Sequence, residues 1–300
     1  MRILALSLAV LIAGGLAAQA QPAPALLINA PEELASARKR LESFDRSSLA
    51  GIVRMTGLID PGPPIHVILA DESSAAAASV SASTAGYAIG DSGLIVLFPS
   101  RSPVYPHDTL EDVLRHEVAH VLISRAAQGN PVPRWFHEGF AVAAERPWRL
   151  EDRSRLVWEL MAGPRLTVDD IDRLFDSEAL RPRAYSLSAA MVREMLRAHG
   201  PDAPAAILRE LGTGGGFDAA VVRVTGRPIS GVEREFWDRQ RVWTVWFSLF
   251  TSGDVLWLGV IVLAAIAVWR RRKRAAEMRR RWDDEEKAAA ELSARSDDRE

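Results

Sequence analysis

Two histidines and two glutamates stand at spacings that can build a metal centre. His116, Glu117 and His120 form an HExxH run, and Glu138 follows eighteen positions after His120. Residues four apart lie on one face of a helix, so the two imidazoles can point at a single metal ion and Glu117 can reach a water beside it. A catalytic zinc ion needs a third protein ligand and one open position, and Glu138 can supply that ligand. The spacing therefore predicts a catalytic metal centre that holds one Zn2+ per chain.

The flanking residues favour this interpretation over a simpler alternative, an exposed helix that carries two histidines and a glutamate by chance. Asp108, with Glu111 three residues later, is typical of a capping box that starts a helix. Apolar residues recur at helical spacing from Leu110 to Val121, and Gly129 can end the helix. The motif that contains Glu138 then begins directly after a Pro-Val-Pro break.

The two motifs HEVAH and WFHEGFAVAAE resemble those of the gluzincin zinc metallopeptidases, in particular the peptidase MA-like families, whose second motif reads W-x-x-E-G-x-A. The resemblance covers about residues 65–237 and includes the stretch that begins at Tyr185. It implies that His116, His120 and Glu138 bind zinc and that Glu117 is the general base. It also implies an α+β, zincin-like fold, in which a small mixed sheet and the active-site helix precede a helical lobe.

Departures from related families narrow the expected activity. The G-A-M-E-N motif of gluzincin aminopeptidases is absent, which favours an endopeptidase over an exopeptidase. Thermolysin-like members place an acidic residue four positions after the third ligand, where this chain has Val142. Glu145 is therefore the candidate for orienting His116 or His120. By the same resemblance, Leu94 to Phe98 is expected to be the edge strand that pairs with an extended substrate.

The expected chemistry is hydrolysis of a peptide bond. A bound zinc ion lowers the pKa of a water from about 15.7 toward 7, and Glu117 would accept its proton and pass it to the leaving amine. The developing oxyanion needs a donor besides the metal, and Tyr185 is the first candidate, with His137 behind it. The alternative for Tyr185 is a tyrosine packed at a helix start. The remaining histidines stand outside any ligand spacing and are expected to be surface or structural residues: His66, His107 and His199.

The N-terminal residues resemble a secretory signal. Arg2 supplies the positive start, an apolar stretch follows, and Ala18-Gln19-Ala20 is an A-x-A cleavage site. Residues 1–20 are therefore expected to be a signal peptide, the alternative being an N-terminal membrane anchor.

The other end of the chain predicts a membrane span over residues 243–269. Val255 to Trp269 is an uninterrupted apolar run, and part of the apolar stretch before it is needed to reach the roughly 20 residues of a span. Arg270 to Arg274 is strongly basic, so the positive-inside rule places the tail 270–300 in the cytoplasm. The domain over residues 21–240 is then expected on the periplasmic side of a bacterial inner membrane.

Composition agrees with this plan. A net charge of −2 predicts no nucleic-acid partner. The chain has no cysteine, which excludes both disulfides and thiolate ligation of a metal. The expected partners are therefore a protein or peptide substrate and the membrane.

Periodicity predicts the elements around the two motifs. We expect a helix over Pro31 to Phe44, a strand over Ile65 to Leu69, and a loop or weak helix over Ser73 to Ser83. Tyr87 to Ile89 and Leu94 to Phe98 should form a hairpin. Further helices are expected over residues 151–161, 167–175, 186–199, 203–211 and 229–237, with the glycine-rich stretch 212–216 as a connector.

These features together predict a membrane-anchored zinc metallopeptidase that cleaves exported proteins or peptides. Two alternatives stay open: a different zinc hydrolase on the same fold, and a binding or assembly protein of the cell envelope that keeps the fold and the metal but has little catalysis. Glu117 favours an active enzyme, because a scaffold that has lost its activity commonly loses its general base.

Overall fold

The computed structural model describes residues 23–145, 147–251, 257, 260–275 and 277–278. The chain divides into two compact units, Met1–Asp238 and Arg239–Glu300, and all the predicted site residues belong to the first. The predicted signal peptide, residues 1–20, and the tail from residue 279 onward lie outside the described residues.

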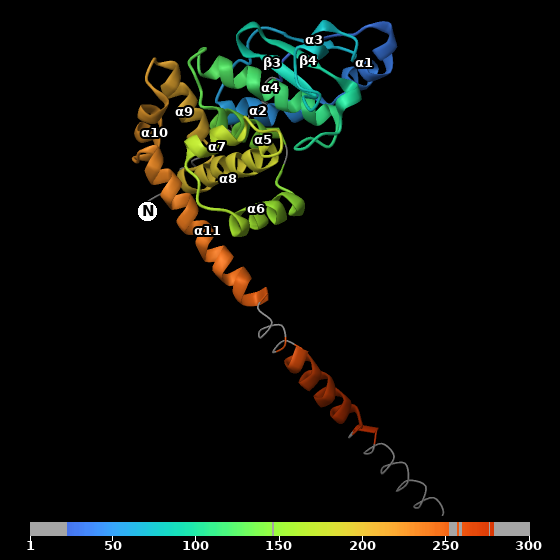
Figure 1. Cartoon of the computed structure of the whole chain (residues 1–300), viewed down its shortest axis with the longest axis vertical. Coiled ribbons are helices and arrows are strands. Elements are labelled where there is room, and N and C mark those ends of the chain that lie inside the picture. Colours follow the sequence, from blue (N-terminus) through green and yellow to red (C-terminus); the bar gives the residue numbers. More distant parts are fainter. Residues whose placement is uncertain (1–22, 146, 252–256, 258–259, 276, 279–300) are drawn as a thin grey trace, which may run out of the picture. The chain divides into compact units, whose positions relative to one another are not determined.

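The first unit has the expected α+β composition, with one small mixed sheet (Figure 1). Its strands are β1 (Leu26–Asn29), β2 (Ile65–Leu69), β3 (Gly86–Ile89) and β4 (Leu94–Leu97), and they are ordered β1-β2-β4-β3. β1, β2 and β4 are parallel, and β3 runs antiparallel to β4. The predicted strand over Ile65–Leu69 and the predicted hairpin are confirmed.

The expectation that Leu94 to Phe98 forms the sheet edge is wrong. β4 lies between β2 and β3, and the two edge strands are β1 and β3. The reason is burial: Ile95, Val96 and Leu97 are buried, so this strand needs a hydrogen-bonded neighbour on each side, whereas β3 has no fully buried residue.

The helices mostly follow the predicted periodicity, with shifted boundaries. The helix predicted over Pro31 to Phe44 begins as a 3-10 turn and continues as α1. The stretch from Ser73 to Ser83, predicted as a loop or weak helix, forms only the single turn α3. The bounds are α1 (Ala35–Glu42), α2 (Ala50–Thr56), α3 (Ala75–Ala78), α4 (Leu110–Ala126), α5 (Arg134–Glu145), α6 (Leu150–Ala162), α7 (Val168–Leu174), α8 (Arg181–His199), α9 (Ala203–Gly212), α10 (Phe217–Thr225) and α11 (Ile229–Thr251). Sequence periodicity missed β1, α2 and α10.

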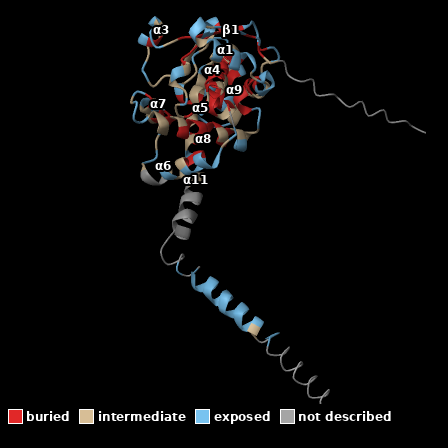
Figure 2. Ribbon diagram, turned by 90° about the vertical axis from the view of Figure 1, so that its right-hand side faces the viewer, coloured by how far each residue is buried: buried red, intermediate tan, exposed pale blue. Residues whose placement is uncertain are grey.

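Two apolar cores give the first unit its two lobes. One core lies between the sheet and helices α1, α2 and α4, and it includes Ile65, Ile95 and Val118. The other lies among α5 and α7 to the start of α11, and it includes Phe140 and Met191. In Figure 2 the buried residues gather in α4, α5 and α8. α4 packs on the sheet and α5 packs on both α4 and α8, so these helices connect the two lobes.

Close contact between α5 and α8 depends on a glycine of the second motif. A Cβ atom at Gly139 would lie 2.4 Å from the backbone oxygen of Ser188, which is too short for any real contact. Glycine therefore lets α5 approach α8 at the residue that directly follows Glu138.

We expect Gly139→Ala to lower the free energy of unfolding by about 1–3 kcal/mol, because the added methyl group must push α5 away from α8. Urea unfolding followed by circular dichroism measures this. Gly51→Ala in α2 is the matched control, since a Cβ there meets nothing within 4 Å, and helix propensity predicts a gain of roughly 0.5–1 kcal/mol for it. Equal effects of the two substitutions would contradict the packing explanation.

Among the described residues, no helix is both long enough and apolar enough to cross a membrane. α11 is long, but its first half carries charged side chains that include Arg234, Asp238 and Arg239. The predicted span over residues 243–269 is therefore not supported by the part that is described, and its residues 252–256 and 258–259 lie outside that part.

Candidate metal centre

Helix α4 carries the HExxH residues at the boundary between the two lobes. Its N-cap is Thr109, whose hydroxyl accepts a hydrogen bond from the backbone N–H of Asp112. The predicted capping box at Asp108 and Glu111 is therefore wrong by one position, because Thr109 and Asp112 make the capping contacts. Val113, Leu114 and Val118 pack into the sheet-side core. The helix is thus anchored by one face, which leaves the HExxH side chains to face the second lobe.

His116, His120 and Glu138 converge as the spacing predicted. The Oε2 atom of Glu138, on α5, lies 3.3 Å from Nε2 of His116 and 3.5 Å from Nε2 of His120. The three ligand atoms lie within 4.8 Å of one another. Ligands about 2.0–2.1 Å from a tetrahedral zinc ion are roughly 3.3–3.4 Å apart. The donor set and its spacing therefore fit zinc.

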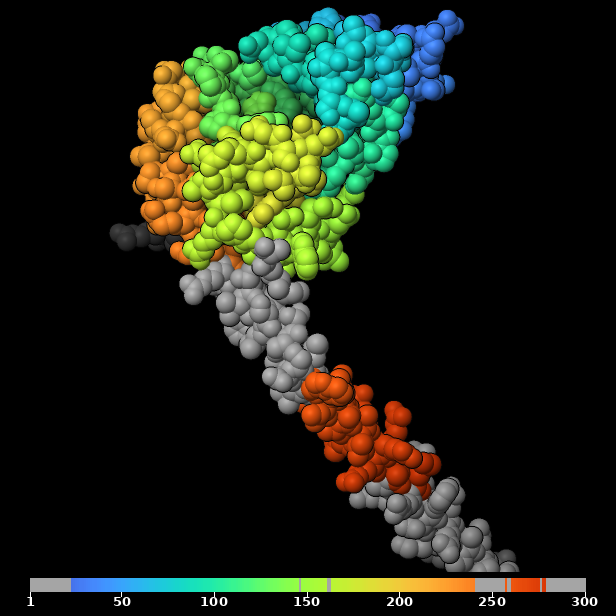
Figure 3. Space-filling view, in the orientation of Figure 1, coloured from blue at the N-terminus to red at the C-terminus, as the bar shows by residue number. Residues whose placement is uncertain are grey.

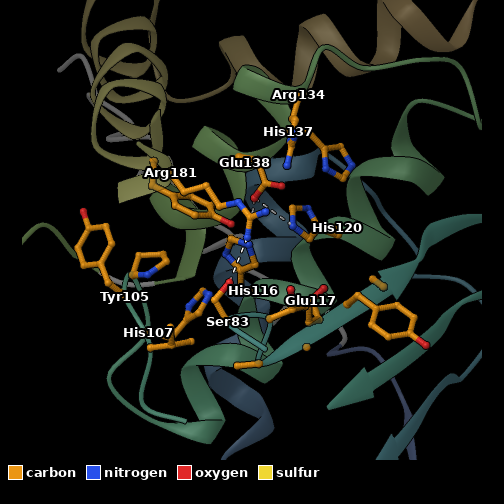
Figure 4. Close-up of a pocket in the computed structure, with 18 of the residues that line it drawn as sticks. Ser83, Tyr105, His107, His116, Glu117, His120, Arg134, His137, Glu138 and Arg181 are labelled. Carbon is orange, nitrogen blue, oxygen red and sulfur yellow. Dashed lines mark hydrogen bonds and ion pairs between the residues drawn. The ribbon is translucent and has the colours of Figure 1, made fainter. Parts of the chain in front are cut away.

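Glu117 lies beside this group and faces the same cavity (Figure 4). Its carboxylate is buried, and within the described part of the chain its Oε2 atom has no hydrogen-bond partner. Burial raises the pKa of Glu117, and the nearby His120 and His116 oppose that shift. A buried carboxylate with an unused acceptor atom can bind and hold the proton of a water molecule.

Glu145 lies beside the first histidine of the HExxH run. Its side chain is fully buried, and its Oε2 atom lies 3.5 Å from Nδ1 of His116 and 3.1 Å from Nδ1 of His107. Burial alone would raise the pKa of Glu145, but its contacts with the two histidines lower the value to about 2. Glu145 is therefore an anion that lies beside Nδ1 of His116 while Nε2 of that ring faces Glu138, the position from which a carboxylate can orient a ligand histidine. Of the two histidines that the sequence suggested for Glu145, the structure places it beside His116.

His107 is the site residue that the sequence missed. It was expected to be an ordinary structural or surface residue, yet it is buried, and its ring lies 4.5 Å from that of His116 in an edge-on arrangement. No periodic spacing in the sequence could have predicted the position of His107, because this residue lies in the loop before Thr109, the N-cap of α4. His107, His116 and Glu145 form a second group with metal-ligand distances, but all three are buried. The group with Glu138 is the better candidate for a catalytic ion because it faces the cavity.

We expect Glu145→Gln to weaken zinc binding by roughly 10–100-fold, because an amide is a poorer acceptor for the two imidazole N–H groups. Competition with a fluorescent zinc chelator measures the affinity. Glu151→Gln, on the exposed side of α6, is the control and should leave the affinity unchanged. Equal affinities of the wild type and Glu145→Gln would exclude the orienting role.

The metal group opens into a cavity of about 580 Å3. Its walls come from β3 and the loop before it, from the loop around His107, and from α4, α5 and the start of α8. Figure 3 shows the hollow between the cyan to teal residues of the sheet lobe and the yellow residues around α7 and α8. The cavity therefore lies between the lobes, with the metal group on one of its walls.

Tyr185 and His137 both line this cavity. The Tyr185 ring centroid lies 6.2 Å from that of His116, and the His137 ring stacks on His120 at 4.4 Å. Tyr185 stands in the second turn of α8 and not at a helix start, because α8 begins at Arg181. His66 and His199 are not among the residues that line the cavity.

Electrostatics distinguish the two candidate donors. Burial raises the pKa of Tyr185 well above its usual value, and Glu138 and Glu117 raise it further, so the hydroxyl keeps its proton. Burial and the charge of His120 lower the pKa of His137 to about 3, so this imidazole is neutral.

Burial would also raise the pKa of Glu138, but His120 and His116 hold it well below the usual range. Glu138 is thus a carboxylate, as a metal ligand must be.

No family model, curated protein or solved structure matches this chain in a comparison with known proteins.

Proposed function

We propose that this chain is a zinc-dependent metallopeptidase that hydrolyses exported proteins or peptides, with endopeptidase activity. The observation that carries the proposal is the convergence of His116, His120 and Glu138 beside the buried Glu117, on the wall of an open cavity. Two imidazoles, one carboxylate and an adjacent carboxylate base are the groups that metal-assisted hydrolysis requires.

His116, His120 and Glu138 would hold the zinc ion, which supplies Lewis acidity and makes a water acidic near neutral pH. Glu117 accepts the proton of the attacking water at its free Oε2 atom and then donates it to the nitrogen of the leaving amine. The Tyr185 hydroxyl donates a hydrogen bond to the oxygen that becomes negative in the transition state. Glu145 keeps the His116 ring in place throughout.

β3 gives a peptide substrate a place to bind. It is the edge strand on the cavity side of the sheet, and residues 85–88 line the cavity. An extended peptide can add to such an edge through backbone hydrogen bonds, which bind any sequence and leave selectivity to the side-chain pockets. This proposal assigns to β3 the role that the sequence had suggested for Leu94 to Phe98.

We expect Tyr185→Phe to lower kcat by roughly 10²-fold with little change in KM, because the hydroxyl acts mainly on the transition state. Steady-state kinetics on one cleaved peptide measure both constants. Tyr87→Phe is the control, since Tyr87 also lines the cavity but packs against Phe98. A Tyr185→Phe enzyme with the wild-type kcat would leave Tyr185 as a packing residue.

The experiment that tests the function is cleavage of a defined peptide mixture by the zinc-loaded full chain, followed by mass spectrometry. The expected result is a reproducible set of internal cleavages that a zinc chelator removes and added zinc restores. Hydrolysis of non-peptide amides or esters without peptide cleavage would favour a different zinc hydrolase.

The proposed location is the periplasmic side of a bacterial inner membrane, and it rests on the sequence of the two chain ends. Separation of soluble and membrane fractions from cells that express the full chain tests it. A periplasmic protein that needs no detergent for extraction would argue against the C-terminal anchor.

A further inference from the structure

Two arginines face the cavity from the helical lobe. Arg181 is the first residue of α8 and Arg134 is the first residue of α5, and both line the cavity that contains the metal group. They contact the same residue, because Nε of Arg181 donates to the Phe175 carbonyl and the Arg134 guanidinium lies 4.7 Å above the Phe175 ring. The Tyr185 ring packs edge-on against Phe175 at 5.2 Å. Both arginines and Tyr185 are therefore grouped around Phe175.

Arg181 has binding capacity that the protein itself does not use. Its Nη1 atom donates to the Ser83 hydroxyl at 3.2 Å, and Figure 4 shows the side chain reaching across the cavity toward Ser83. Within the described part of the chain, Nη2 has no hydrogen-bond partner and no carboxylate lies within 4 Å of the guanidinium. Arg101 is different, because its guanidinium pairs with the carboxylate of Glu72. A guanidinium with free N–H groups in a cavity is a ready partner for a carboxylate.

Arg134 adds a second positive charge that is only weakly compensated. Its Nη1 atom lies 3.5 Å from Asp176, and both side chains are largely exposed, at 46% and 77%. Glu178 also lines the cavity, but it is exposed and pairs with neither arginine in the described structure. Arg134 therefore places a second, loosely paired guanidinium group on the wall of the cavity.

The direction of β3 indicates which end of a bound peptide would lie near Arg181. Gly86, the first residue of β3, lies against the start of α4, since a Cβ atom there would be 2.9 Å from Val113. Gly90, directly after β3, lies against the end of α4, since a Cβ atom there would be 2.6 Å from Ser124. β3 and α4 therefore run in the same direction. Antiparallel pairing is the more frequent and slightly more stable mode. A peptide paired antiparallel to β3 has its C-terminal part at the Gly86 end. Ser83, which bonds Arg181, stands three residues before Gly86.

We propose that Arg181, assisted by Arg134, binds a carboxylate of the substrate on the C-terminal side of the scissile bond. This inference rests on the proposed peptidase function and names its substrate class. The carboxylate has two possible sources: the free C-terminus of a peptide cleaved near its end, or an Asp or Glu side chain that shortly follows the cleaved bond. Arg181 is thus a specificity-determining residue, and Arg134 has the smaller share because it is half exposed.

Binding of three matched hydroxamates to the zinc-loaded full chain tests the proposal by calorimetry, without the need for turnover. All three share one metal-binding group and a benzylsuccinyl spacer. They end in alanine with a free C-terminal carboxylate (alanine acid), in alanine amide, which has no carboxylate, or in glutamate amide, whose only carboxylate is on the side chain. The expected result is roughly tenfold tighter binding of at least one carboxylate compound than of alanine amide. Tight binding of alanine acid alone identifies the C-terminal carboxylate, and tight binding of glutamate amide alone identifies an acidic side chain.

Arg181→Gln should bring the three dissociation constants close together, whereas Arg209→Gln, at an exposed position of α9, should keep the wild-type preference. Equal binding of the three compounds by the wild type overturns the proposal, and that result needs no variant to fold. A preference that persists in Arg181→Gln also overturns it. If the wild type prefers a carboxylate compound but cleaves no peptide, the peptidase proposal fails and the carboxylate site stands.

Discussion

Glu117→Gln is expected to lower kcat by about 10³-fold or more while the protein keeps its fold and its zinc. Glutamine has nearly the same shape as glutamate, but its amide cannot accept the proton of the attacking water. General acid–base catalysis contributes roughly 10²–10⁴-fold in enzymes, and Glu117 would act both as base toward water and as acid toward the leaving amine. Cleavage of a single fluorogenic peptide, with zinc content measured on the same sample, gives both quantities.

Glu111→Gln is the matched control for Glu117→Gln. Glu111 stands on the same helix, but it pairs with Arg40 and does not line the cavity. We expect this variant to keep the wild-type kcat. Undiminished cleavage by Glu117→Gln would remove Glu117 as the general base. A wild type that binds zinc but cleaves nothing would favour the alternative of a binding or assembly protein of the cell envelope.

Glu138→Ala is expected to abolish stoichiometric zinc binding. The wild type should hold one zinc ion per chain, and loss of the anionic ligand should weaken binding by more than the roughly 10–100-fold that an outer partner costs. The apolar side of α5 should keep the variant folded, since Trp135, Phe136 and Phe140 are buried in the helical core and do not depend on Glu138. Metal analysis after gel filtration, together with circular dichroism, measures both properties.

His107→Ala tells the two candidate metal groups apart. His107 belongs only to the buried group with Glu145, and Glu138 belongs only to the group on the cavity wall. If the ion is held at the cavity, Glu138→Ala loses zinc and His107→Ala keeps it with reduced affinity. The reverse result would place the ion in the buried group and would refute the proposed catalytic arrangement. Glu178→Ala controls for the removal of a carboxylate that lines the cavity without being a ligand.

The sequence by itself determined the parts of this site that depend on local regularity. Residues four apart on a helix share a face, so the placement of His116 and His120 followed from their spacing alone. Strand β2 and the hairpin of β3 and β4 were predictable, because apolar runs between turn residues report backbone conformation within a few neighbours. The side chain of Glu138 was predictable from a motif resemblance, and the structure brings it to the two histidines.

Only the tertiary structure decided which distant segments meet. The strand order made β3, and not β4, an edge strand, because hydrogen bonding between strands is set by the packing of the whole lobe and not by the apolar run of β4. His107 reached Glu145 across 38 positions, and Arg181 reached Ser83 across 98. Neither pair has a periodic signal, because each joins a loop residue, His107 or Ser83, to the end of a distant helix. The identity of the candidate ligands could thus be inferred from the two sequence motifs, whereas the contacts of Glu145, the edge position of β3 and the arginines on the cavity wall arise from long-range packing.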